Sequence, residues 1–81
     1  MKTASQAGYS LTYTKSSSGF QFVTVRKEHD YCEFWVDDNQ IYPSSKNDFG
    51  FFDMPLSVIQ LIRFWFGSIT FEEYDRALKG L

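Results

Sequence analysis

The segment that most constrains the fold is residues 54–66, a run of thirteen residues that is almost wholly apolar. Its polar side chains are Ser57, Gln60 and Arg63. Plotted at about 100° per residue, most of its apolar side chains share one arc of about 160°, which predicts a helix with a broad core face. That face consists of Met54, Val58, Ile59, Leu61, Ile62, Trp65 and Phe66.

The ends of this helix carry residues that commonly begin and stop helices. Asp53 is predicted to be the N-cap, with Pro55 in the first turn, where its missing amide hydrogen is not needed. Gly67 is expected to end the helix. Leu56 and Phe64 lie outside the core arc, so they must either lie under another element or remain exposed.

A second helix is predicted over residues 70–80. Thr70 and Glu73 have the spacing of a capping box, and Gly80 is placed to stop the helix. Its apolar side chains share one face, which we expect to pack against the rest of the domain. They are Phe71, Tyr74, Ala77, Leu78 and Leu81.

The first half of the chain has the period-two alternation of strands. Residues 9–14 and 31–36 alternate cleanly, while residues 20–26 place Phe20 and Phe22 on one face and valines on the other. A bulge near Phe22, or a strand covered on both faces, would explain that break.

Turn residues separate these strands. Asp37 to Gln40 read as a hairpin loop, because Asp and Asn tolerate left-handed backbone conformations. A brief strand at residues 41–42 is then stopped by Pro43.

The pattern as a whole predicts one α+β domain spanning residues 1–81. We expect a flexible tail at 1–8, an antiparallel sheet of three to four strands (a β-meander) over 9–43 and a loop at 44–52. Two C-terminal helices follow, the apolar one at 53–67 and the amphipathic one at 70–80. Aromatic residues make up 20% of the chain and supply the dense core that so short a chain requires.

Composition also narrows the class of protein. A single cysteine, Cys32, cannot form an internal disulfide, which suits a reducing compartment. The N-terminus lacks the apolar run of a secretory signal, and residues 54–66 are shorter than the roughly 20 needed to span a bilayer. A net charge of −2 argues against direct nucleic-acid binding. We therefore expect a cytoplasmic protein with no membrane segment.

The sequence contains no complete catalytic or metal-binding pattern. His29 lies in a charged turn without a convergent partner, and Cys32 alternates inward as a buried thiol. The aspartates lack the spacing of a calcium loop, and the glycines are isolated at turns. We predict no catalytic residue, no metal ligand and no cofactor.

Protein binding is the function that the sequence favours. Aromatic and aliphatic side chains outside the core can act as anchors, and neighbouring acidic groups suit a basic partner surface, although solubility explains each acid equally well. The predicted partner-binding residues are Tyr31, Trp35, Asp37, Asp38, Asp48, Phe49, Phe51, Leu56 and Phe64.

In size and composition the chain resembles phage-encoded inhibitors of bacterial defence systems, including anti-CRISPR proteins. The resemblance implies a small inhibitor that occludes a site on a larger partner, such as a basic complex that handles nucleic acid. One alternative is a homo-oligomeric or accessory-subunit domain, so the chain is expected to be a monomer or a homodimer. Another is a single-stranded nucleic-acid binder in which strand aromatics stack on bases.

Overall fold

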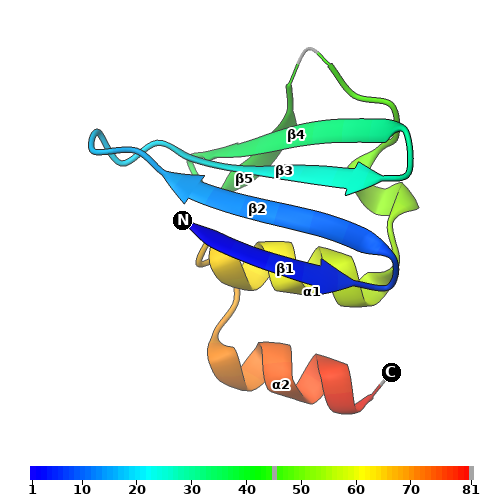
Figure 1. The fold of residues 1–81 in the computed structure, drawn as a ribbon. Coiled ribbons are helices and arrows are strands. Elements are labelled where there is room, and N and C mark those ends of the chain that lie inside the picture. Colours follow the sequence, from blue (N-terminus) through cyan, green and yellow to red (C-terminus); the bar gives the residue numbers. More distant parts are fainter. Residues whose placement is uncertain (45, 81) are drawn as a thin grey trace.

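The computed structural model describes residues 1–44 and 46–80. It shows an α+β fold in which a five-stranded antiparallel meander precedes two C-terminal helices, as Figure 1 shows. Neighbouring strands follow one another in sequence, so every sheet connection is a hairpin. The strands are β1 (Lys2–Gln6), β2 (Tyr9–Lys15), β3 (Gln21–Lys27), β4 (Asp30–Asp37) and β5 (Gln40–Pro43). A 3₁₀ turn, η1 (Phe51–Asp53), leads into α1 (Leu56–Trp65), and α2 (Phe71–Lys79) follows.

The first strand corrects the expected flexible tail. Lys2–Gln6 pair with β2 in the register Lys2↔Tyr13 to Gln6↔Tyr9. The hairpin is closed by Ala7 and Gly8, both at positive φ (53° and 83°), as the tight turns that join antiparallel strands require. Because β1 is polar apart from Ala4, its sequence has no apolar alternation and did not predict a strand. With β1 included, the sheet has five strands rather than the expected three to four.

The hairpin loop expected at Asp37 to Gln40 is confirmed. Asp37 pairs with Gln40, and the two loop residues Asp38 and Asn39 have φ values of 50° and 62°. Both are residue types that tolerate the left-handed region, which explains why this turn could be predicted from the sequence.

The core lies between one face of the sheet and α1. Its fully buried members include Leu11, Val23, Val25 and Phe34 from the sheet and Val58 and Ile62 from α1. Both helices lie on the same side of the sheet, with α2 beyond α1 (Figure 1). Among the described residues, no helix lies on the opposite face of the sheet.

The break in alternation on β3 reflects this one-sided arrangement. The β2–β3 register runs without interruption from Ser10↔Arg26 to Lys15↔Gln21, so no bulge is present near Phe22. Val23 and Val25 face the helices and are fully buried, while Phe22 lies on the other face.

The start of α1 differs from the expected one. Asp53 does not cap α1; its carboxylate accepts a hydrogen bond from the Gly50 amide (2.9 Å) and closes η1 instead. Pro55 is the residue that precedes α1. The predicted stop at Gly67 is confirmed, with φ 78° and a Schellman pair of bonds from Ser68 N–H to Arg63 O (2.8 Å) and from Gly67 N–H to Phe64 O (3.0 Å).

The second helix begins as predicted but packs more loosely than expected. The Thr70 hydroxyl accepts from the Glu73 amide (3.1 Å), and the Thr70 amide donates to the Glu73 carboxylate (3.3 Å), which is the capping box. The helix packs against α1, yet none of its described residues is buried, and Phe71 is 62% exposed. Leu81, assigned to the same face, lies outside the described residues. Over the described ranges, no helix has the length and hydropathy needed to cross a membrane.

Replacing Thr70 with Ala should lower the free energy of unfolding of α2 by about 1 kcal/mol, because the Glu73 amide loses the hydroxyl that accepts its hydrogen bond. Hydrogen exchange of the α2 amides measures the local effect, and thermal melting measures the global one. Ser17→Ala, in the exposed β2–β3 loop, is the control. Unchanged exchange in α2 would contradict the role of the cap.

Candidate functional site

The uncovered face of the sheet carries a row of four aromatic side chains, here called the aromatic strip. The ring contacts run from Phe22 of β3 to Phe20 in the β2–β3 loop, then to Trp35 of β4 and on to Tyr42 of β5. The register places Phe22 opposite Trp35 and Trp35 opposite Tyr42, which are cross-strand neighbours on one face. Ring centroids along the strip are 5.9, 5.6 and 5.2 Å apart.

The strip leaves much of its aromatic surface in water. Phe20, whose ring lies between those of Phe22 and Trp35, is 46% exposed, and Tyr42 at the β5 end is 41% exposed, while Phe22 and Trp35 are half-buried. The rings are tilted by only 33° to 40° to one another, so their faces form a nearly continuous surface. Contiguous exposed apolar surface is common at interaction sites of small domains, so the strip is the candidate site.

Two of the predicted acidic residues lie beside the strip. Asp37 is two residues beyond Trp35 on β4 and therefore on the same face, and Asp38 occupies the adjoining turn. Both carboxylates are exposed. The aromatic surface thus has a negative border at the β4–β5 end.

Tyr31 lies on the same face of β4, nearer the start of that strand. Its ring lies under the Arg26 guanidinium (5.2 Å), and its hydroxyl donates to the Glu33 carboxylate (3.1 Å). Burial raises the pKa of the Tyr31 hydroxyl, and the hydrogen bond to Glu33 raises it further. The tyrosine is therefore held in a polar cluster next to the strip rather than within it.

Asp48 and Phe49 both have partners within the domain, although Asp48 is exposed. The Asp48 carboxylate accepts from the Tyr31 amide (2.8 Å), and the Asp48 amide donates to the Tyr31 carbonyl (3.1 Å). The Phe49 ring packs edge-on against Tyr9 (5.8 Å). These contacts tie the loop after β5 to the first residues of β4.

Cys32 is a buried thiol, as the alternation predicted. The Cys32 thiol donates a hydrogen bond to the Phe49 carbonyl (2.8 Å), and its sulfur accepts one from the Phe49 amide (3.1 Å). Burial raises the pKa of the Cys32 thiol, outweighing the opposing effect of the main-chain bond from Phe49. The protonated thiol is an inert packing group in this setting.

Phe64 is covered by the second helix. Its ring stacks on Tyr74 at 4.9 Å with an interplanar angle of 9° and meets Phe71 edge-on at 5.8 Å. Of the two side chains left outside the core arc, Leu56 is the exposed one and Phe64 holds α1 and α2 together. The predicted anchor at Phe64 therefore lies in an interface within the domain.

Phe51 and Leu56 line a groove beside β5, together with Phe52, which sequence reasoning did not single out. The strip likewise contains Phe20, Phe22 and Tyr42, which were not among the predicted binding residues. Two features of the sequence could have pointed to these residues. Phe51 and Phe52 are adjacent, so only one of them can turn inward, and the alternation on β3 is broken.

His29 is exposed in the β3–β4 turn. Within residues 1–44 and 46–80, no three His, Cys, Asp or Glu side chains are grouped closely enough to hold a metal ion.

Comparison of the chain with protein-family models, curated proteins and solved structures finds no match.

Replacing Phe64 with Ser should lower the free energy of unfolding by about 2 kcal/mol, because a half-buried aromatic contact between the helices is lost. Phe52→Ser is the matched control, since that ring is 87% exposed and its loss should change stability little. Chemical denaturation of both variants makes the comparison. Equal stability of the two would mean that the Phe64 contact with α2 contributes nothing.

The buried thiol predicts a pH dependence with a definite sign. At a pH below the ordinary pKa of a thiol, the folded and unfolded chains both keep the proton on Cys32, and the contribution of the buried thiol to the free energy of unfolding is fully present. As the pH rises, the unfolded chain releases the proton first, so the free energy of unfolding falls. Between about pH 8 and about pH 10, the wild type should therefore lose more stability than Cys32→Ala. Parallel pH profiles of the two proteins would contradict this expectation.

Proposed function

We propose that the protein is a non-enzymatic binding module that docks on a partner protein through its aromatic strip. The observation that carries the proposal is the row of four rings on an uncovered sheet face, in which Phe20 and Tyr42 are exposed. Large aromatic side chains at the centre of an interface supply most of the binding free energy in many complexes. A flat sheet face also presents them without a conformational change.

The charge around the strip favours a basic partner surface. Asp37 and Asp38 lie beside the rings, and the exposed faces of Trp35 and Tyr42 can each receive an Arg or Lys side chain by a cation–π contact. The Arg26 guanidinium over Tyr31 is an example of that contact within the domain. Carboxylates at the rim would also speed the association with a positively charged partner.

Occlusion is the mode of action that we propose. A domain of 81 residues that binds through its aromatic strip acts most directly by covering a site on a larger protein. The target would be a basic, nucleic-acid-handling complex in the cytoplasm, and the protein would be an inhibitor of the phage anti-defence kind. Surfaces that bind nucleic acid are basic, so an acidic, aromatic face is complementary to them.

Two alternatives use the same face. A second copy of the chain could cover the strip in a homodimer. Single-stranded nucleic acid could stack on the rings, but Asp37 borders the strip, and carboxylates repel phosphates.

Replacing Phe20 and Tyr42 together with Ser should weaken partner binding by about thirtyfold, equivalent to about 2 kcal/mol, because the two exposed rings of the strip are removed. Affinity capture from a bacterial lysate with tagged proteins identifies the partner, and titration with the purified partner gives the affinity. Thr12→Ala, on the same sheet face but away from the rings, is the matched control.

The contrary outcomes are distinguishable. A partner that binds the wild type and the double variant equally would place the interface elsewhere. A dimer in size-exclusion chromatography with light scattering that the double variant dissociates would favour the oligomeric alternative. Binding of a labelled oligothymidylate with loss in the double variant would favour nucleic acid.

A further inference from the structure

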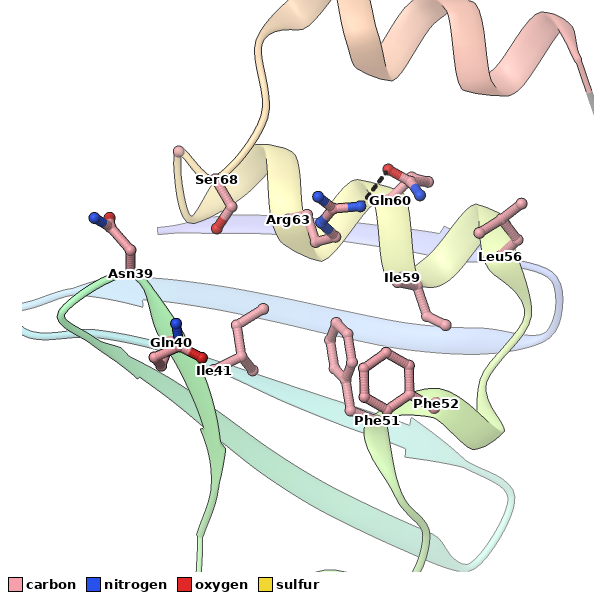
Figure 2. A pocket seen from close by; sticks show the side chains of 11 residues that line it. Asn39, Gln40, Ile41, Phe51, Phe52, Leu56, Ile59, Gln60, Arg63 and Ser68 are labelled. Atoms are coloured by element: carbon pink, nitrogen blue, oxygen red, sulfur yellow. Dashed lines mark hydrogen bonds between the residues drawn. The ribbon is translucent and has the colours of Figure 1, made fainter.

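A groove of about 780 Å³ lies between the edge strand β5, η1 and α1. Figure 2 shows Ile41, Phe51 and Phe52 along one side, with Leu56 and Ile59 of α1 facing them from the other. None of its lining side chains belongs to the aromatic strip, so the groove is a separate surface.

Two of the apolar side chains at the groove contribute little to the core. Phe52 is 87% exposed and meets only the edge of the Phe51 ring in an aromatic contact (5.3 Å, 87°), and Leu56 is 50% exposed. Phe51, by contrast, packs edge-on against the buried Phe34 (5.5 Å). Phe52 and Leu56 therefore offer apolar surface that an incoming side chain can cover, in a concave site of the size that binds ligands.

The charge of the groove differs from that of the whole chain. Arg63 is the only ionisable residue among those that line it, although the protein carries a net charge of −2. Its guanidinium donates one long hydrogen bond to Gln60 (3.5 Å), and no described carboxylate lies within 4.0 Å of it. A guanidinium with donors to spare beside an apolar groove is complementary to a carboxylate.

The main chain of β5 faces the groove as an open sheet edge. Asp37 and Gln40 flank the two-residue hairpin loop and form its closing hydrogen-bonded pair, so the next pair, Val36 and Ile41, is not hydrogen-bonded. The amide and carbonyl of Ile41 therefore point away from β4. Beyond it, Pro43 has no amide hydrogen and ends the strand.

We infer that this groove binds an extended peptide that carries a carboxylate. The peptide adds to the edge of β5 at Ile41, places an apolar side chain against Phe52 and Leu56, and pairs its carboxylate with Arg63. Strand addition supplies main-chain hydrogen bonds, while the apolar and charged contacts supply selectivity. The carboxylate is that of an acidic side chain within the peptide, and recognition of a peptide C-terminus instead is an outcome of the test.

The test uses degenerate fluorescent hexapeptides with apolar residues at alternate positions. One pool has a free C-terminal carboxylate, a second has a C-terminal amide, and a third has the amide and one internal Asp. The immobilised wild-type protein should retain the third pool over the second. Retention of the first pool alone would overturn the assignment to an acidic side chain in favour of a peptide C-terminus. Arg63→Gln should weaken retention about tenfold, and bound peptide should slow hydrogen exchange of the Ile41 amide.

Two further variants separate the possible causes of failure. Phe52→Ser should also lose retention, and its exposed position keeps the fold intact. Arg76→Gln on α2 removes the same charge outside the groove and should have no effect, as should the Phe20 and Tyr42 double variant of the strip. Absence of retention of all three pools, equal retention of the carboxylate and amide pools, or retention that Arg63→Gln leaves unchanged would overturn the inference, whatever the fate of the strip.

Discussion

The packing of α1 on one face of the sheet is the interaction on which the rest of this structure depends. Val58 and Ile62 of the helix and Val23, Val25 and Phe34 of the sheet are essentially removed from water. Each such side chain contributes about 1.5–3 kcal/mol by its burial, and no disulfide is available to share the task. Because this single helix covers the sheet from one side, the other side is left open to solvent with its aromatic residues in place.

The two helices differ in their relation to that core. Trp65 and Phe66 of α1 lie close to Tyr13 of the sheet (ring centroids 6.0 and 6.1 Å), so the end of α1 is held by the strands. The second helix reaches the domain through α1, where Tyr74 stacks on Phe64. A helix that contacts Phe64 through the rings of Tyr74 and Phe71 but buries none of its own described residues is expected to open more readily than the core.

The elements with local signals were predictable from the sequence. The capping box at Thr70, the stop at Gly67 and the Asp38–Asn39 turn each depend on a few neighbouring residues, and all are present. Strand β1 was missed because Lys2–Gln6 lack apolar alternation and are held by pairing with β2. Asp53 was assigned to the wrong helix. Its carboxylate could cap either η1 or α1, and the sequence alone does not show which of the two it caps.

The candidate surfaces were harder to predict, because they depend on register. Trp35 was recognised as an outward aromatic, but its neighbours Phe22 and Tyr42 come from other strands and join it only through cross-strand pairing. The position of Phe64 under Tyr74 depends on the angle at which the chain leaves Gly67, which no periodicity encodes.

The alternation of β5 connects the two surfaces. Tyr42 ends the aromatic strip on the open face, and the preceding Ile41 lines the groove on the helix side. With Pro43 ending the strand, only a short edge is available for pairing, so main-chain hydrogen bonds alone would bind a peptide weakly. Affinity at this edge must then come from the side chains on either side of it. A ligand at the groove and a partner on the strip would meet the same strand from opposite faces, and a shift in the β4–β5 hairpin would be felt at both.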